Sequence, residues 1–195
     1  RCIVLYGKDK TSTNLVDFGT YVSNKIDDGN WKILTYLNKK SLYRFILGWG
    51  LGQYNFKNKN ILKNIEIPNN VNKKNLINML AGILYGKELI NLPSSYMGPD
   101  ALEKSFIDFS LYHKATTNII HGTELVKEFP LIHAVGKASI EAPRLLELNW
   151  GSSQHPTIIL IGKGVCFDTG GLDLKPSQYM RNMKKDMGGA ASILS

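Results

Sequence analysis

The chain has 195 residues and a mass of 21.8 kDa, a length that fits one ordinary domain or two small ones. Its 43% hydrophobic and 21% charged residues are enough to bury a core, which excludes a disordered tail and a fibrous repeat. The net charge of +8 raises the question of nucleic-acid binding, but only four of the 24 basic residues are arginines, the side chain that phosphate recognition favours.

The first part of the sequence alternates strand and helix patterns. Apolar spacing predicts, in chain order, a strand at 3–6, a helix at 11–26, a strand at 31–37, a helix at 40–54 and a strand at 61–67. Gly48 lowers the propensity of the second helix unless it marks close packing. The polar stretch 68–74 precedes a helical apolar face at 75–89. We therefore expect an N-terminal α/β region at 1–70 and a connecting helix within 71–90.

The remaining residues, 91–195, read as the opening of a larger domain. The patterns predict a loop at 93–99, a helix at 100–109, a strand at 116–120, a short helix at 124–128, and strands at 131–135, 144–150 and 157–161. Strands that alternate with helices predict a largely parallel sheet covered on both faces, with the apolar run 157–161 as its buried member. The predicted fold class is α/β, with a smaller N-terminal region followed by a larger mixed-sheet domain.

Two features bear on location and completeness. Cys2 and Cys166 are too few for a disulfide scaffold or a cysteine-based zinc cluster, and no apolar run reaches the roughly 18 residues that suggest a membrane span. We therefore expect a soluble, cytoplasmic chain without a signal peptide. The small-residue run 188–195 carries no helix stop signal. We interpret this end as a cut inside an element, and the chain as a fragment of a longer protein.

The residues that carry chemistry follow the predicted strand 157–161. Ligands of open α/β sheets gather beyond the carboxyl ends of strands, and glycines there let the backbone bend tightly. This glycine-rich stretch holds four charged side chains, Lys163, Asp168, Lys175 and Asp186. Charges in such an apolar setting need a charged partner or a metal ion.

Other familiar sites do not match the sequence. A P-loop that ended at Lys163 would need a glycine at 157 and a Ser or Thr at 164, where this sequence has Thr157 and Gly164. Neither a G-x-S-x-G nucleophile elbow nor an H-E-x-x-H motif occurs. Cys166 fits a small buried thiol better than a nucleophile. The histidines are isolated in sequence and are interpreted as structural or solvated: His113, His121, His133 and His155.

The spacing of the four charged residues is specific. Starting from Lys163, they follow one another at steps of 5, 7 and 11 residues, within Gly162-Lys163-Gly164, Phe167-Asp168-Thr169-Gly170-Gly171, Lys175-Pro176 and Met183-Lys184-Lys185-Asp186-Met187-Gly188-Gly189-Ala190-Ala191. This pattern closely resembles the first metal-binding block of the leucyl aminopeptidase family of cytosolic two-metal exopeptidases. Upstream stretches are also similar to that family: Asn91-Leu92-Pro93, Gly98-Pro99, Ile132-His133-Ala134-Val135-Gly136-Lys137-Ala138-Ser139 and Ala142-Pro143-Arg144-Leu145. The resemblance covers residues 84–195 well and the first part loosely.

The resemblance implies a role for each charged residue and the start of a hydrolase-like catalytic domain. Lys163 would be a metal ligand through its neutral amine, Asp168 would bridge two divalent ions, and Asp186 would ligate the same ion as Lys163. Lys175 would be the catalytic cation that stabilises the oxyanion formed when metal-activated water attacks a peptide carbonyl. Carboxylate oxygens and an amine suit Zn²⁺, Mn²⁺ or Mg²⁺. Peptides with a free N-terminus as substrates, a bicarbonate in the complete enzyme and a homo-hexamer are implied as well.

The sequence also departs from the family pattern. A later block that supplies a further Asp and Glu ligand, and an arginine that holds the bicarbonate, does not occur in this chain. The fragment alone is therefore expected to be inactive. Asp173 stands where many relatives have a small polar residue, and we expect it to be solvated or bonded to its loop. Two alternatives stay open: a non-catalytic relative, and a member that also binds nucleic acid, against which the low arginine content argues. The preferred N-terminal residue of the substrate and the physiological metal are left open.

Overall fold

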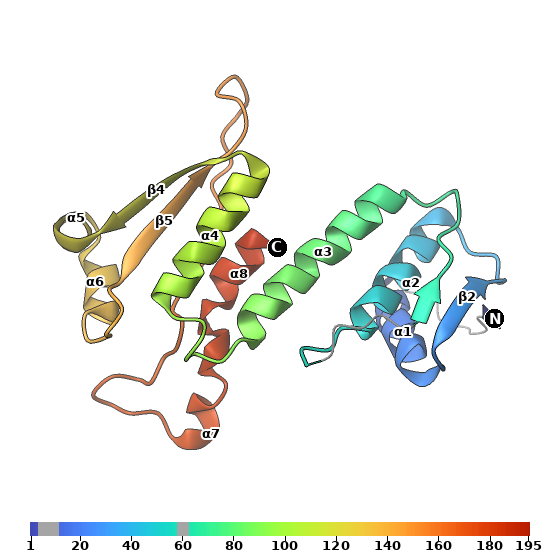
Figure 1. Ribbon diagram of the computed structural model, residues 1–195, viewed down its shortest axis with the longest axis horizontal. Coiled ribbons are helices and arrows are strands. Elements are labelled where there is room, and N and C mark those ends of the chain that lie inside the picture. The colour runs from blue at the N-terminus through green and yellow to red at the C-terminus, as the bar shows by residue number, and fades with distance from the viewer. Residues whose placement is uncertain (4–11, 58–62) are drawn as a thin grey trace. The chain divides into compact units, whose positions relative to one another are not determined.

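The computed structural model describes residues 1–3, 12–57 and 63–195 (Figure 1). The chain divides into two compact units, Arg1–Leu84 and Tyr85–Ser195. Within the described residues the strands form two separate sheets, one in each unit. Both units combine helices with a small sheet, which confirms the predicted α/β class.

The division between the two units falls within helix α3 (Lys73–Asn91), where the sequence predicted a helix at 75–89. The helix is confirmed, and it begins two residues earlier and ends two residues later than predicted. The domain limits 1–70, 71–90 and 91–195 stay a prediction.

The first unit contains a parallel three-stranded sheet in the order β1-β2-β3. Its elements in chain order are β1 (Cys2–Ile3), α1 (Ser12–Lys25), β2 (Gly29–Ile33), α2 (Lys39–Gly52) and β3 (Lys63–Ile65). Both helices lie where the sequence predicted them, whereas β2 begins and ends earlier than the predicted strand 31–37. The predicted strands 3–6 and 61–67 lie partly outside the described residues.

Helices α1 and α2 pack tightly together in the first unit. A Cβ added at Gly48 would collide with the backbone of Val16, and one at Gly19 would collide with the backbone of Phe45. The glycine inside α2 therefore marks close helix packing and does not break the helix. Phe45 and Trp49 of the same helix are fully buried in the core of this unit. Asn38 begins α2 because its side chain accepts a hydrogen bond of 2.9 Å from the Ser41 backbone N–H.

The second unit continues from α3 with six helices and two strands among the described residues. They are α4 (Pro99–His113), β4 (Thr116–His121), α5 (Gly122–Glu128), α6 (Pro130–Gly136), β5 (Arg144–Asn149), α7 (Ser177–Met180), the 3₁₀ helix η1 (Met183–Met187) and α8 (Gly188–Leu194). The core of this unit joins the end of α3 to α4, η1 and α8. None of the described helices is long and apolar enough to cross a membrane.

Two predictions for residues 116–149 are wrong. The predicted strand 131–135 is helix α6, which begins at Pro130, a residue whose fixed φ suits the first helical position. The predicted largely parallel sheet is also not seen, because β4 and β5 pair antiparallel, from Thr116 opposite Asn149 to His121 opposite Arg144. Two strands joined by a pair of short helices can pair either parallel or antiparallel, and the sequence pattern does not distinguish these two arrangements.

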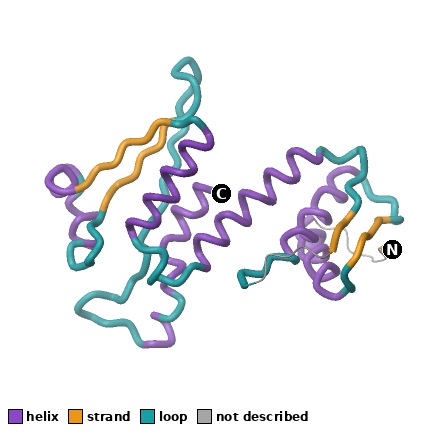
Figure 2. The backbone as a smooth tube through the Cα atoms, in the orientation of Figure 1, coloured by secondary structure: helices purple, strands orange, loops and turns teal. Residues whose placement is uncertain are grey.

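The predicted buried strand 157–161 is also wrong for this structure. These residues form no strand, and Ile158, Ile159, Leu160 and Ile161 are 82, 78, 67 and 91% exposed. Figure 2 shows the stretch as part of the loop that follows β5. A strand needs a neighbour to take its backbone hydrogen bonds, and the β4–β5 pair does not extend to this run.

Candidate metal centre

Asp168 and Lys175 come together because the loop between them closes on itself. The Gly170 N–H donates a hydrogen bond of 2.8 Å to Asp168 Oδ1, and the Lys175 N–H donates one of 2.9 Å to the Thr169 carbonyl. Gly170 has a φ of 97° and Gly171 a φ of 77°, a backbone region that favours glycine. The loop thus returns Lys175 to Asp168, where its Nζ donates a hydrogen bond to Asp168 Oδ2.

Lys163 and Asp186 form the second pair of the cluster. The Lys163 Nζ lies 3.1 Å from Asp186 Oδ2, and the two side chains are 62 and 17% exposed. The Ala190 N–H donates a hydrogen bond of 2.9 Å to the Lys163 carbonyl, which places residue 163 against the first turn of α8. Gly189 is required there, since a Cβ at this position would lie 2.7 Å from the Lys163 backbone nitrogen.

Electrostatics links the two pairs. The hydrogen bond from Lys175 lowers the pKa of Asp168, the Gly170 N–H adds to this effect, and the charge of Lys163 lowers the pKa further. The four residues singled out from the sequence thus form a charged cluster of two ion pairs, linked by the effect of Lys163 on the pKa of Asp168. Their roles in chemistry stay a prediction.

The pKa of Asp168 leads to a pH prediction for this chain. A carboxyl whose pKa is lowered on folding stabilises the folded protein at pH values above the ordinary carboxyl pKa of about 3.9. That stabilisation is lost as the pH falls through the lowered pKa. The Gly170 amide proton shift should therefore titrate with a midpoint below about 3.9 in ¹H–¹⁵N NMR spectra. Lys175→Met should raise the midpoint, and Asp168→Asn should remove the transition. An unchanged midpoint in Lys175→Met would contradict the pairing.

Asp186 carries the observation that bears most directly on a metal. Its Oδ2 is buried and has no hydrogen-bond partner in the described structure, because Lys163 lies at ion-pair distance without hydrogen-bond geometry. The Lys163 ammonium at 3.1 Å offsets part of the cost of burying this oxygen, and a metal ion bound by Asp186 and a neutral Lys163 would satisfy it directly. Carboxylate oxygens beside an amine form the hard donor set that divalent ions prefer. The residues of the cluster therefore fit a divalent metal ion.

The cluster holds few ligands. Within the described residues, no group of three or more His, Cys, Asp or Glu side chains could hold a metal ion. Two carboxylates and two amines are too few to surround two ions, which agrees with the sequence-based count of further ligands supplied elsewhere.

Cys166 precedes Asp168 by two residues in the sequence and behaves as a small core side chain. It packs against the core of the second unit. Burial raises the pKa of its thiol to about 11, with a further rise from the charge of Glu141 and an opposing effect of Arg144. A thiol with this pKa is protonated at neutral pH and is a poor nucleophile.

Sequence reasoning missed two contact networks that support the site's surroundings. The Arg144 guanidinium donates to the carboxylates of Glu103 and Asp100, which fastens the start of β5 to α4. Lys184 Nζ donates to Asn91, at the end of α3. Asn91 and Arg144 both lie in stretches that resemble the family, but their partners are 93 and about 40 residues away, and no local pattern signals such contacts.

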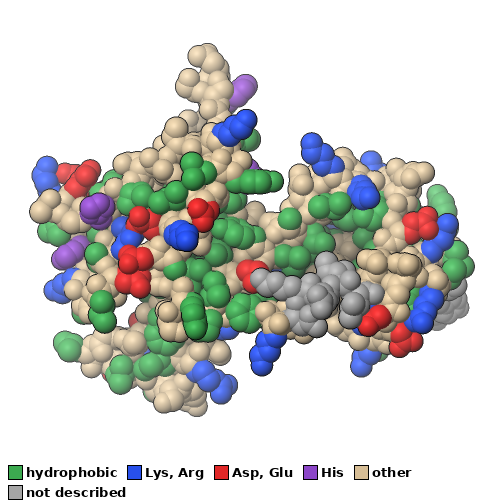
Figure 3. All heavy atoms as spheres, in the orientation of Figure 1, with side chains coloured by type: hydrophobic (Ala, Val, Ile, Leu, Met, Phe, Trp, Pro, Cys, Tyr) green, Lys and Arg blue, Asp and Glu red, His purple; other side chains and the backbone are tan. Residues whose placement is uncertain are grey.

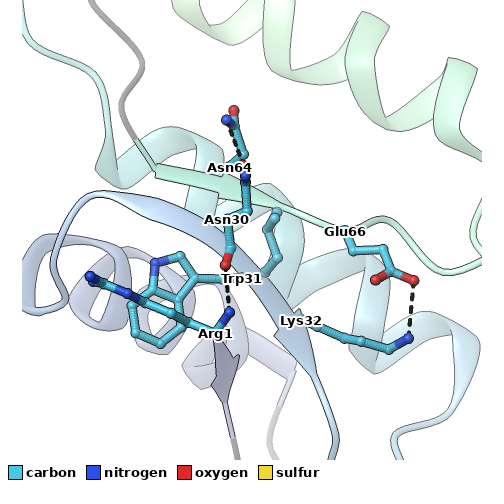
Figure 4. Close-up of a pocket in the computed structure, with 7 residues that line it drawn as sticks. Arg1, Asn30, Trp31, Lys32, Asn64 and Glu66 are labelled. Carbon is cyan, nitrogen blue, oxygen red and sulfur yellow. Dashed lines mark hydrogen bonds and ion pairs between the residues drawn. The ribbon is translucent and has the colours of Figure 1, made fainter.

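A shallow pocket in the first unit is separate from these residues. Its volume is about 380 Å³. Its polar groups are bonded to one another, as Figure 4 shows: Asn64 donates to Asn30, and Lys32 pairs with Glu66. The Arg1 guanidinium lies over the Trp31 ring at 5.6 Å. None of the predicted site residues lines this pocket.

Known proteins are similar to this chain in both sequence and fold. Residues 85–195 match the cytosol aminopeptidase family, catalytic domain. A probable cytosol aminopeptidase of Corynebacterium efficiens is 31% identical over 181 residues, which span 84% of this chain and 36% of that protein. Peptidase B of Photorhabdus laumondii is 38% identical over 129 residues, or 62% of this chain and 30% of that protein.

Solved structures extend the likeness to the fold. The cytosol aminopeptidase from Coxiella burnetii has a TM-score of 0.86 and 35% identity, and the match covers 94% of this chain and 41% of that one. The bottromycin maturation enzyme BotP, solved in complex with Mn, shares the fold with a TM-score of 0.75 at 22% identity.

The chain thus has the α/β fold of solved aminopeptidases across both of its units. It belongs to the cytosol aminopeptidase family, which confirms the resemblance found in the sequence. It spans just over a third of the length of the Corynebacterium relative, at 36%.

Proposed function

We propose that the complete protein is a two-metal-dependent aminopeptidase that releases N-terminal residues from peptides. The observation that carries the proposal is the cluster of Lys163, Asp168, Lys175 and Asp186 inside the region that matches the family, with a buried Asp186 oxygen that faces Lys163 but accepts no hydrogen bond. Further ligands would come from the part of the protein outside these residues. Family membership supports the reaction class, and peptides with a free N-terminus would be the substrates.

In this proposal Lys163, Asp168 and Asp186 are the metal ligands that this chain contributes. Asp186 offers its Oδ2, which accepts no hydrogen bond, and Asp168 offers a carboxylate that its lowered pKa keeps ionised at neutral pH. Lys163 must lose a proton to become a ligand, so metal binding at this site should release protons. When bound, the ions would activate a water and polarise the peptide carbonyl.

Lys175 has a different task from the other three residues. Its hydrogen bond to Asp168 holds the ammonium at the edge of the proposed metal site. A protonated amine there can donate to the oxygen on which negative charge develops during attack on a peptide carbonyl. Lys175 is therefore the catalytic residue of the proposal.

The choice of metal and the assembly belong to the same proposal. Zn²⁺, Mn²⁺ and Mg²⁺ all suit the donor set, and Mn²⁺ is the probe to use first because BotP, which shares the fold, was solved in complex with Mn. Bicarbonate in the complete enzyme, a homo-hexamer and a cytoplasmic location follow from the family resemblance. On the face drawn in Figure 3, basic side chains are scattered and do not gather in one patch, so nucleic-acid binding is not favoured.

Peptide hydrolysis with and without Mn²⁺ tests the proposal. The complete protein should release N-terminal residues from unblocked peptides, lose this activity with a chelator and leave N-acetylated peptides intact. The 195-residue chain alone should be inactive under the same conditions, because too few ligands hold the ions. An active, chelator-sensitive 195-residue chain would contradict the ligand assignment. A complete protein that binds Mn²⁺ but hydrolyses no peptide would instead be the non-catalytic relative.

A further inference from the structure

Lys184 makes a long-range contact that the proposed mechanism does not use. It lies on η1, two residues before Asp186, and is half-buried. Its Nζ lies 3.2 Å from Asn91 Oδ1 and 3.5 Å from the Asn91 carbonyl oxygen. Asn91 is the last residue of α3, where backbone carbonyls lack intrahelical donors and the helix dipole is negative. Lys184 thus caps the end of a 19-residue helix from a distant part of the chain.

A second anchor holds η1 one turn further along. Met187 is fully buried in the core of the second unit, together with Leu89 of α3 and Ala191 of α8. Residues three apart lie on the same side of a 3₁₀ helix, so Lys184 and Met187 share one face. Asp186 is displaced from that face by about a third of a turn. Two contacts on one face therefore fix the rotation of η1 about its axis, and this rotation decides where the Asp186 carboxylate points.

The state of Asp186 shows why this rotation needs to be fixed. Its Oδ2 is buried without a hydrogen bond and faces the Lys163 Nζ at 3.1 Å, so the direction of this carboxylate matters for any ion bound there. The 3₁₀ turns of η1 have poorer hydrogen-bond geometry than the α-helix α8 into which they lead, so the backbone of η1 holds this orientation only weakly. Contacts to a longer helix and to the core supply the missing rigidity.

We propose that Lys184 is a positioning residue for the metal site: its hydrogen bonds to Asn91 hold η1 so that the Asp186 carboxylate faces Lys163. The inference rests on the proposed function, because it assigns to Lys184 the orientation of a proposed ligand. Lys184 does not touch the metal or the substrate in this arrangement. Its effect should therefore appear in metal affinity more than in folding.

The test compares Mn²⁺ binding by variants of the complete protein, measured by calorimetry without peptide. Lys184→Met should raise the Kd for Mn²⁺ by about tenfold to a hundredfold, the usual cost of losing a residue that orients a ligand. Lys184→Arg keeps a donor that reaches Asn91 and should restore most of the affinity. Lys185→Met is the matched control, because it removes the same charge from the exposed next residue, and its Kd should change by less than about twofold.

The melting temperature of the metal-free variants separates positioning from folding. A Lys184→Met protein with a lower melting temperature and an unchanged Kd would overturn the inference, as would a Lys185→Met protein that loses as much affinity. If Lys184→Met does not fold, Asn91→Ala tests the same contact and should weaken Mn²⁺ binding in the same direction. An unmodified protein that binds no Mn²⁺ would refute the proposed function, and an unmodified protein that binds Mn²⁺ as tightly as Lys184→Met would refute the positioning role alone.

Discussion

Replacing Asp168 by asparagine in the complete protein is expected to abolish peptide hydrolysis through loss of metal. The substitution removes the charge of the carboxylate that would bridge both ions, and a bound ion supplies several kcal/mol of transition-state stabilisation. Activity should fall by at least about 10³-fold, and metal content by elemental analysis should fall with it. The loop should keep its shape, because an asparagine oxygen still accepts the hydrogen bond from the Gly170 N–H.

The same loop offers a matched control. Asp173 carries an equal charge five residues further on, and it is exposed and outside the cluster's ion pairs. Asp173→Asn should therefore keep both metal content and activity near the unmodified values. An Asp168→Asn protein that retained its metal and lost only turnover would show that Asp168 acts in the chemical step and does not hold the ions.

Local signals explain which parts of the fold could be predicted. Helix α4 was predicted at 100–109 because Pro99 marks its start and apolar residues repeat at helical spacing. The helix continues to His113 and ends at Lys114, which has a left-handed φ of 55°. The prediction ended too early because helices commonly end in a left-handed glycine or asparagine, and neither stands here. The end of this helix therefore depended on a backbone conformation without a residue signature.

Long-range pairing explains which parts could not be predicted. The run 157–161 has the composition of a buried strand, but composition does not supply the neighbouring strand that would bury it, and its side chains are exposed in these 195 residues. The helix α6 shows the opposite error, since an apolar stretch of strand-like length follows a proline that favours a helix start.

The site itself was predicted unevenly for the same reason. The pairing of Asp168 with Lys175 depends on a glycine turn that is visible in the sequence as Gly170-Gly171. The proximity of Lys163 and Asp186 was expected only from the family resemblance, which puts both on one ion. The close approach of the chain to α8 at Gly189 that brings them together is visible only in the folded unit. The contact between Lys184 and Asn91, which we propose positions Asp186, has no local signal in the sequence.

Replacing Lys175 by alanine should separate catalysis from metal binding. The variant loses the ammonium proposed to donate to the oxyanion, but it keeps all three proposed ligands, so the metal content should match that of the unmodified protein. The pKa of Asp168 should rise once its principal hydrogen-bond donor is gone, yet its carboxyl stays ionised at neutral pH because its ordinary pKa is about 3.9. The kcat should fall by about 10²–10³-fold, the cost of one oxyanion donor, with a smaller change in KM. Lys185→Ala, at an exposed site, should leave kcat unchanged. Full turnover in Lys175→Ala, measured beside an intact metal content, would remove Lys175 from the mechanism.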